Sequence, residues 1–152
     1  MAKEDDLVFI EAGAEDAFEK GICCSKDRKS KGYQAKVSWL QQPHNREVRL
    51  LLVSKHVDGI IGFAEYMPSE AAWRPVSADN YMFIQCIVMY RKASRSQGVA
   101  GKMLAVIEEK ALSLGMNGVC AMCSSGTWMA GKSLFEKNGY AVCDQLDRFE
   151  LL

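Results

Sequence analysis

A glycine-containing segment at Arg95–Gly101 has residue types that can bind phosphate. It reads Arg-Ser-Gln-Gly-Val-Ala-Gly and lies between a run of β-forming residues and an amphipathic run. A turn of this kind at a helix start points several backbone N–H groups the same way, and the helix dipole adds positive potential, which suits a pyrophosphate. Gly98 lets the backbone approach a phosphate closely. Arg91, Lys92 and Arg95 add positive charge, although an ordinary turn before a helix explains the glycines alone equally well.

Two further motifs have the spacing of known sites but lack the partners that those sites need. Residues 126–133 read Gly-Thr-Trp-Met-Ala-Gly-Lys-Ser, which matches the phosphate-binding Walker A pattern. Only 19 residues follow Ser133, too few for the strand that carries a magnesium-binding aspartate. Cys120 and Cys123 form a single Cys-x-x-Cys pair, and zinc needs two more suitably spaced ligands. We therefore expect neither a nucleoside triphosphatase nor a metal site.

The elements that would position these groups follow the order of an α+β domain. β-branched and apolar runs predict strands, and Asp58-Gly59 between two of them is a strong hairpin signal. Apolar residues at three- and four-residue steps predict an amphipathic helix directly after Arg95–Gly101. We expect a mixed, largely antiparallel sheet flanked by helices, in one domain covering residues 1–152. The predicted strands are 7–11, 48–57, 60–67, 81–90, 118–123, 140–145 and 148–152, and the predicted helices are two short ones within 14–42, broken at Gly21 and Gly32, then 100–114 and 127–137.

The composition excludes several classes of partner. The 19 basic and 19 acidic residues give a net charge of zero, whereas a protein that binds nucleic acid usually carries a basic excess. The N-terminus has no apolar signal region, and no apolar run approaches the roughly 18 residues that suggest a membrane span. We therefore expect a cytoplasmic protein that binds neither nucleic acid nor membrane. Its six cysteines are then expected to be reduced thiols rather than a disulfide framework.

The motif Arg95-x-x-Gly98-x-Ala100 resembles the acetyl-CoA signature of the GNAT superfamily of N-acetyltransferases, in which Gln or Arg is followed by x-x-Gly-x-Gly or Ala. The strand before it and the helix after it match the family, and Leu134–Tyr140 is similar to the family's frequent Tyr-Glu-Lys-x-Gly-Phe. The resemblance is good over residues 48–152 and weaker before them. Residues 22–40 and 128–132 also resemble the YoaP-like branch of the superfamily.

The resemblance implies how acetyl-CoA would bind and react as a co-substrate. Backbone N–H groups of residues 97–101 would hold its pyrophosphate, and backbone groups of Ile87 and Met89 would pair with its pantetheine arm as a further strand would. The thioester would lie where two strands splay apart, often beside a β-bulge. A small amine or a peptide would attack it directly, with no covalent acyl-enzyme. The expected coenzyme-binding residues are Ile87, Val88, Met89, Arg95, Ser96, Gln97, Gly98, Val99, Ala100 and Gly101.

In the superfamily, the loop after the third strand commonly lines the groove for the acceptor. Glu65, where this strand runs toward the loop, is therefore a candidate general base, because desolvation beside an apolar groove raises the pKa of a carboxylate toward the range useful for proton transfer. Arg74 is a candidate contact for an acidic group on the acceptor. A surface pair beside a packed tryptophan explains both residues equally well.

The chain departs from the family at a residue that often assists the leaving group. Phe135 stands where many members have a tyrosine general acid, and a phenyl ring cannot protonate a thiolate. A non-catalytic module that binds acyl-CoA, for sensing or for docking a partner, is therefore the alternative to an N-acetyltransferase. A redox or metal module built on the cysteines is a third hypothesis.

The last residues predict an apolar edge strand. Residues 148–152 alternate apolar and polar side chains as far as Leu151 and stop without a polar tail. YoaP-like relatives continue beyond such a strand, so we expect either part of a longer protein or a short member whose edge a partner subunit covers. An open edge of this kind favours pairing with another chain, and a homodimer is the expected result.

Thiol titration of the unfolded protein, without added reductant, should detect close to six free thiols. The reason is that a reducing compartment keeps cysteines from forming disulfides. The same titration after full reduction supplies the reference count. A count near zero before reduction would contradict both the reduced state and the expected compartment.

Overall fold

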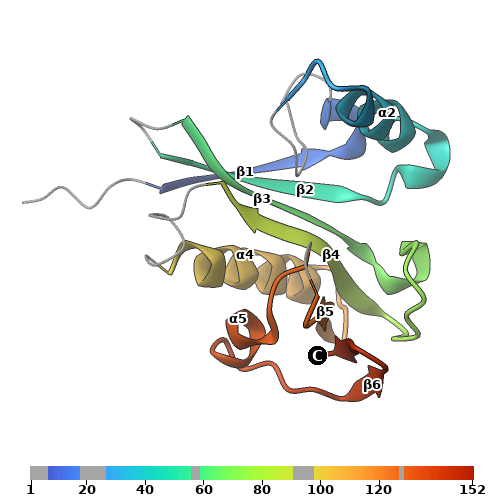
Figure 1. Cartoon of the computed structure of the whole chain (residues 1–152), viewed down its shortest axis with the longest axis vertical. Coiled ribbons are helices and arrows are strands. Elements are labelled where there is room, and N and C mark those ends of the chain that lie inside the picture. The colour runs from blue at the N-terminus through green and yellow to red at the C-terminus, as the bar shows by residue number, and fades with distance from the viewer. Residues whose placement is uncertain (1–6, 18–26, 56–58, 91–97, 127–128) are drawn as a thin grey trace, which may run out of the picture.

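The computed structural model describes residues 7–17, 27–55, 59–90, 98–126 and 129–152. In this part of the chain, seven strands form one sheet in the order β1-β2-β3-β4-β5-β7-β6 (Figure 1). β4 and β5 run parallel, and the other neighbouring strands run antiparallel. The predicted α+β fold with a mixed, largely antiparallel sheet is therefore confirmed. The strands are β1 (Leu7–Gly13), β2 (Arg49–Lys55), β3 (Gly59–Pro68), β4 (Tyr81–Met89), β5 (Gly118–Ser124), β6 (Asp144–Leu146) and β7 (Phe149–Leu151).

Helices cover both faces of the sheet. α2 (Lys31–Leu40) lies over one face and α4 (Val99–Ser113) lies along the other (Figure 1). The short α5 (Lys132–Glu136) follows β5 along the chain. Short 3-10 turns occur in the connections, as η1 (Ala14–Asp16), η2 (Pro43–Asn45) and η3 (Ser69–Ala71). Among the described helices, none has the length and apolar character that a membrane crossing requires.

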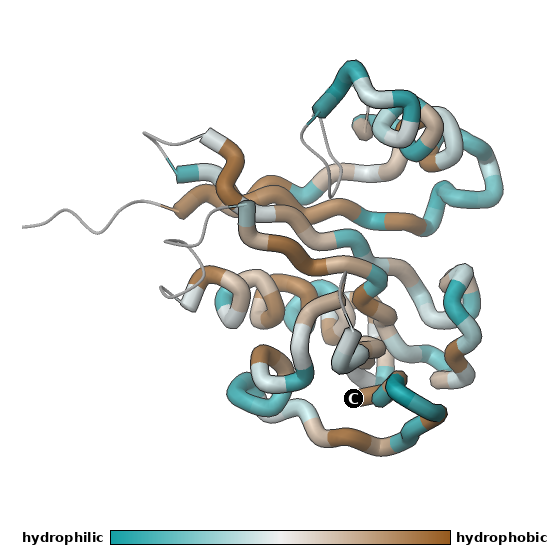
Figure 2. Tube along the Cα trace, viewed as in Figure 1, coloured by the Kyte–Doolittle hydropathy of each residue, from teal (hydrophilic) through white to brown (hydrophobic). Residues whose placement is uncertain are grey.

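The apolar core consists of two clusters, one on each face of the sheet. On the α4 face, Leu104 and Ile107 pack with Ile84, and on the α2 face Val37 packs with Phe63. Figure 2 shows that hydrophobic residues concentrate in the central strands. Because β4 is covered on both faces, nearly every residue along it is apolar, as in a fully buried strand.

The N-terminal helical region differs from its prediction. The side chain of Ser30 caps α2 by accepting a hydrogen bond from the backbone N–H of Tyr33 at 3.2 Å. Gly32 therefore lies in the first turn of α2, and the predicted helix break at this residue is wrong. A glycine costs little there because the cap has already fixed the turn. The predicted break at Gly21 lies outside the described residues.

α4 is bounded by glycines in the left-handed region at both ends. Gly98 has φ +70° at the N-cap, and Gly115 has φ +69° just after the C-terminus. The backbone N–H of Met116 donates to the carbonyl of Ala111 at 3.0 Å, which closes the helix end. A residue with a Cβ is strained in this conformation, so both positions favour glycine.

The two C-terminal strands differ from their prediction in extent and in which of them forms the edge. Residues 140–143 form no strand, and β6 begins only at Asp144. β7 lies between β5 and β6, and the buried Leu152 exchanges backbone hydrogen bonds with Ala121 at 2.9 and 3.0 Å. The last strand is therefore paired on both sides, and the edge is the short, exposed β6. This arrangement removes the open edge from which a homodimer was predicted.

Leu104→Ala should lower the free energy of unfolding by about 2–5 kcal/mol, because it removes a fully buried side chain from the α4 face of the core. Leu112→Ala in the same helix should change it by less than about 0.5 kcal/mol, because that side chain is 78% exposed. Urea unfolding of both variants measures the difference. Equal losses would contradict the packing of α4.

Candidate functional site

β4 and β5 separate in the middle of the sheet. Their parallel ladder pairs Tyr81–Ile84 with Gly118–Ala121 and extends no further. Beyond it, β5 pairs with β7 on its opposite edge, through Met122–Ser124. The two strands diverge from this point on, so that the segment of β4 from Gln85 to Met89 has β3 on one side and the divergence on the other (Figure 1).

The backbone of β4 presents donors toward this divergence. The N–H of Tyr90 donates to the carbonyl of Ile61 at 2.9 Å, which fixes the direction of the N–H groups at the end of β4. Because N–H groups alternate along a strand, that of Val88 also points to β3, and those of Ile87 and Met89 point away from it. This is the orientation that an extended ligand needs to pair with β4. The predicted coenzyme contacts of Ile87 and Met89 stay predictions. The predicted contact of Val88, which lies between them with its N–H toward β3, stays one too.

A β-bulge lies at the start of the divergence. Cys86 pairs with Glu65 and Ile84 pairs with Tyr66, so Gln85 is an extra residue on β4. The bulge changes which side chains face which layer. Ile84 lies in the core on the α4 face, and beyond the bulge Cys86 packs against the core on the α2 face. The bulge thereby brings polar and thiol side chains of β4 under α2.

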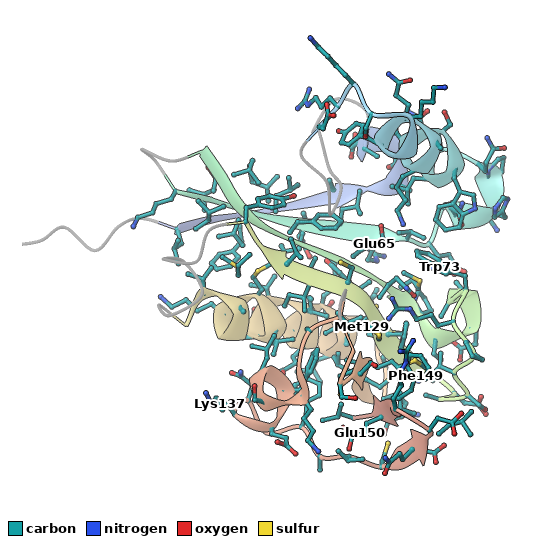
Figure 3. The ribbon with its side chains drawn as sticks, viewed as in Figure 1. Glu65, Trp73, Met129, Lys137, Phe149 and Glu150 are labelled. Atoms are coloured by element: carbon teal, nitrogen blue, oxygen red, sulfur yellow. The ribbon has the colours of Figure 1, made fainter. Side chains whose placement is uncertain are left out.

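Polar side chains from α2, β3, β4 and the loop after η3 meet on the α2 face beside this bulge. The carboxylate of Glu65, whose side chain is 2% exposed, forms an ion pair with the ammonium of Lys36 on α2 at 3.0 Å. Gln85, with its amide oxygen turned toward the loop after η3, accepts from Nε of Arg74 at 2.6 Å and from Nε1 of Trp73 at 3.3 Å. Figure 3 shows Glu65 and Trp73 on this side of the sheet.

The charges in this cluster influence one another. Burial lowers the pKa of Arg74, while the nearby Cys86 and Glu65 raise it, so the guanidinium keeps its charge among groups that attract it. The ammonium of Lys36, 3.0 Å from Glu65, supplies a counter-charge to that buried carboxylate. The predicted base is therefore paired with a lysine, a contact that the sequence did not indicate.

Two tryptophans enclose the lysine. Trp39 of α2 and Trp73 of the loop pack edge to face with ring centroids 4.5 Å apart. The Nζ atom of Lys36 lies 5.0 Å from the centroid of Trp39 and 4.5 Å from that of Trp73, within the range of cation–π attraction. Neither Lys36 nor Gln85 was predicted as a site residue from the sequence. A glutamine inside an otherwise apolar strand was the available signal for Gln85, whereas nothing in the local sequence around Lys36 points to a residue of β3.

The start of α4 is the described part of the predicted phosphate-binding turn. Gly98 has the left-handed conformation, and a Cβ there would meet no atom of the described residues within 4 Å. Val99 is buried in the core, and a Cβ on Gly101 would come within 2.7 Å of Oδ1 of Asn138. Ala100 follows in the first turn of α4 and is half-buried. The predicted contacts at Arg95, Ser96 and Gln97 lie outside the described residues.

Phe135 is part of the core and offers no acid. It is 1% exposed and packs edge to face on Tyr140, with ring centroids 5.5 Å apart. The hydroxyl of Tyr140 donates to Glu108 at 3.0 Å, and burial together with that carboxylate raises the pKa of Tyr140. This hydroxyl is therefore a poor proton donor to a thiolate.

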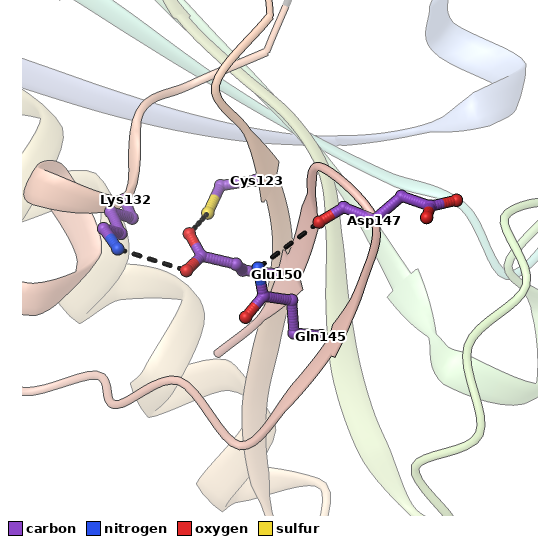
Figure 4. Close-up of polar contacts among 5 residues, drawn as sticks. All are labelled: Cys123, Lys132, Gln145, Asp147 and Glu150. Carbon is purple, nitrogen blue, oxygen red and sulfur yellow. Dashed lines mark hydrogen bonds and ion pairs between the residues drawn. The ribbon is translucent and has the colours of Figure 1, made fainter.

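A pocket of about 340 Å³ lies beside the end of β5. At its wall, Glu150 accepts from Nζ of Lys132 at 3.1 Å and from Sγ of Cys123 at 3.9 Å (Figure 4). Burial and the charge of Glu150 raise the pKa of Cys123, which makes this thiol a weak nucleophile. Because Lys132 is engaged by Glu150 and α5 has only five residues, the structure also argues against the Walker A interpretation. Ser124, Ser125, Gly131, Gln145, Asp147 and Arg148 complete the lining.

The described cysteines and histidines form no metal site. No group of three or more potential ligands (His, Cys, Asp or Glu) occurs among the residues with assigned positions. No disulfide joins any two of the four described cysteines, Cys86, Cys120, Cys123 and Cys143. Burial raises the pKa of Cys120 to about 12, as expected for a thiol that serves packing.

The chain is similar to known acetyltransferases. No protein-family model matches it. It is 24% identical over 143 residues to the "Uncharacterized N-acetyltransferase YoaP" of Bacillus subtilis, covering 91% of this chain and 55% of that protein. The chain thus spans about half the length of this curated relative.

Solved structures share its architecture. One is an acetyltransferase assigned to the GNAT family from Desulfovibrio desulfuricans, with a TM-score of 0.64 and 13% identity, covering 97% of this chain and 98% of that one. Another is AAC(6')-Iy in complex with the bisubstrate analogue CoA-S-monomethyl-acetylneamine, with a TM-score of 0.68 and 14% identity, covering 93% of this chain and 95% of that one. The chain therefore has the fold of the GNAT superfamily, the same superfamily that its sequence resembles.

Proposed function

We propose that this chain is an N-acetyltransferase that moves the acetyl group of acetyl-CoA onto an amine by direct attack. The observation that carries the proposal is the divergence of β4 from β5 beside the bulge at Gln85, with the N-terminus of α4 following β4. This geometry offers an extended edge for pantetheine and a helix N-terminus for a pyrophosphate. The similarity to YoaP and the CoA-containing analogue bound by AAC(6')-Iy support the same assignment.

The coenzyme fits residues of this chain on two grounds. The N–H groups of Ile87 and Met89 point to the divergence, so they can pair with the amide groups of a pantetheine arm. Gly98 starts α4 without a side chain of its own, and the first N–H groups of a helix have no partner within the helix, so they can bind an anion. Arg95, Ser96 and Gln97 complete the proposed pyrophosphate contacts.

In the proposed reaction, the chain positions the acceptor, polarises the thioester and removes a proton. A backbone N–H of β4 beside the bulge polarises the thioester carbonyl, and alignment of amine and thioester lowers the entropic cost of attack. Glu65 accepts a proton from the acceptor amine, directly or through water. The sulfur leaves as a thiolate that takes its proton from water or from the amine, because Phe135 carries no hydroxyl.

The acceptor is proposed to be a small amine or a peptide that reaches the bulge from the α2 face. Glu65, Lys36 and Arg74 give that face alternating charges, which favours an acceptor with polar groups. Arg74 is bound to Gln85, so a carboxylate on the acceptor would meet a guanidinium that is already oriented.

A non-catalytic module that binds acyl-CoA remains the second candidate, and the buried Phe135 is the observation that favours it. Release of free thiol from acetyl-CoA, measured with a panel of amines, amino acids and peptides, separates the two. An enzyme releases thiol faster in the presence of its acceptor. A sensing module binds the coenzyme and releases none beyond the rate of spontaneous hydrolysis.

Acetyl-CoA should bind and raise the melting temperature, since a ligand at a hundred times its Kd stabilises the native state by about 2.7 kcal/mol. Gly98→Val should remove most of this shift. Gly115→Val is the matched control, because both glycines bound α4, have φ near +70° and have open space around the Cα. Calorimetry and thermal unfolding measure both effects.

If millimolar acetyl-CoA gives no binding heat with the unmutated chain, the assignment is wrong. Equal loss of the ligand-induced shift in both variants would mean that backbone strain alone explains the effect. Loss with Gly98→Val alone would place the coenzyme at the turn before α4.

Glu65→Gln should lower turnover by roughly 10²-fold or more while leaving the affinity for acetyl-CoA nearly unchanged, because it removes a general base. Loss of the base should also change the dependence of the rate on pH, so the variant and the unmutated enzyme should have different pH–rate profiles. Glu11→Gln, which removes the partner of Lys110 on the opposite face, is the control. If the unmutated enzyme and the Glu65→Gln variant have the same pH–rate profile, the base lies elsewhere.

A further inference from the structure

Lys36 places a primary amine at the predicted base. Its Nζ atom is 3.0 Å from the carboxylate of Glu65, although the two residues lie 29 positions apart in the sequence. This is the distance at which a general base receives a proton from an acceptor amine. The ammonium of Lys36 therefore has the contact that the proposed reaction requires of a substrate.

The surroundings of Lys36 hold the amine in position while leaving its side chain accessible. The rings of Trp39 and Trp73 attract Nζ from 5.0 and 4.5 Å, and the side chain is still 27% exposed. A lysine side chain that was free in solvent would sample many rotamers, whereas three attractive partners restrict this one. The restriction reduces the entropic cost of bringing the amine to an electrophile.

Lys36 also lies near the place where the thioester is proposed to bind. Glu65 is directly opposite Cys86, next to the bulge at Gln85, and the divergence from β5 begins on the other edge of β4. Adjacent strands are about 4.8 Å apart, so a ligand paired with that edge of β4 lies about two strand spacings, ~9.6 Å, from the backbone of Glu65. Rotation about the single bonds of the four-carbon stem moves Nζ of Lys36 from Glu65 toward that ligand.

We propose that Lys36 is a self-acetylation site, modified within the same molecule by acetyl-CoA bound at β4. The inference rests on the proposed function and adds to it an acceptor that belongs to the chain. It identifies the cluster of Glu65, Trp39 and Trp73 as a recognition site for a primary ammonium group, which Lys36 occupies.

The step balances as an ordinary acyl transfer. The ammonium of Lys36 gives one proton to Glu65, and the neutral nitrogen attacks the carbonyl carbon of the thioester. A bond forms between Nζ and this carbon, and the bond between carbon and sulfur breaks. The second proton of the nitrogen goes to the sulfur, so that the products are N-acetyl-lysine and the free thiol, and Glu65 passes its proton to water.

Acetylation would change the site from which it arises. An acetylated lysine has no charge, so the ion pair with Glu65 and both cation–π contacts are lost. The carboxylate would then face the half-buried Arg74 and whatever amine enters from solvent.

The experiment incubates the purified chain with acetyl-CoA and follows acetylation by intact mass and peptide mapping. Lys36 should acquire an acetyl group at least tenfold faster than Lys110. Lys110 is a matched reference for chemical acetylation, because its side chain is also 27% exposed and ion-paired, to Glu11 on the other face. The fraction modified per unit time should not depend on protein concentration if transfer occurs within one molecule.

Lys36→Arg should abolish the fast acetylation of the chain, and Lys110→Arg should leave it intact. The melting temperature of each variant checks that it is folded. Equal rates at Lys36 and Lys110, or a rate at Lys36 that persists after unfolding, would overturn the inference. Calorimetric measurement of acetyl-CoA binding distinguishes failure of self-acetylation from failure of the proposed function. Binding without selective modification of Lys36 refutes self-acetylation alone, whereas absence of binding refutes the proposed function and this inference together.

Discussion

The structure depends on how the backbone hydrogen bonds of β5 are divided between its neighbours. β5 pairs with β4 from Gly118 as far as Ala121. Its other edge pairs with β7 and forms the two hydrogen bonds between Ala121 and Leu152. This second set of bonds directs β5 away from β4. In the described residues, the edge of β4 beyond Ile84 then has no neighbouring strand on that side, although its N–H groups are strong donors that favour a partner. The candidate site is the consequence of this division.

The bulge at Gln85 adds a second constraint. It shifts the register of β4 against β3 so that Cys86 lies opposite Glu65, and it turns polar side chains toward α2. A carboxylate that is 2% exposed is costly to bury without a counter-charge, and Lys36 supplies one from a different layer. Packing of α2 against the sheet is therefore coupled to the electrostatics of the site. The two tryptophans that enclose Lys36 strengthen this coupling, since one comes from α2 and the other from the loop after η3.

Most of the fold follows from local patterns in the sequence. The continuous apolar run at Tyr81–Met89, the helical periodicity after Gly98 and the hairpin signal near residue 58 each depend on neighbours close in the chain, and each predicts an element correctly. The order of the last strands does not follow from such patterns, because β6 and β7 have three residues each and their pairing is decided by β5. From the sequence, Glu65 could be predicted only to be a carboxylate close to the loop after the third strand. Its ion pair with Lys36 joins a helix to a strand, and the bulge that positions it depends on an inter-strand register, so neither has a local signature.

The parallel ladder between β4 and β5 also joins two parts of unequal size. On one side lie β1 to β4, and on the other lie β5, β7 and β6. The joint consists of four residue pairs, reinforced at one end where the N–H of Asn117 donates to the carbonyl of Asn80 at 2.8 Å. Local opening of a protein tends to follow such cooperative units, and the smaller unit has shorter strands and more exposed backbone. In the free chain, we therefore expect slow amide hydrogen exchange in the unit of β1 to β4 and faster exchange in the unit of β5, β7 and β6. A molecule bound between β4 and β5 would make the two units open together, and the amides of the smaller unit would then exchange more slowly as well.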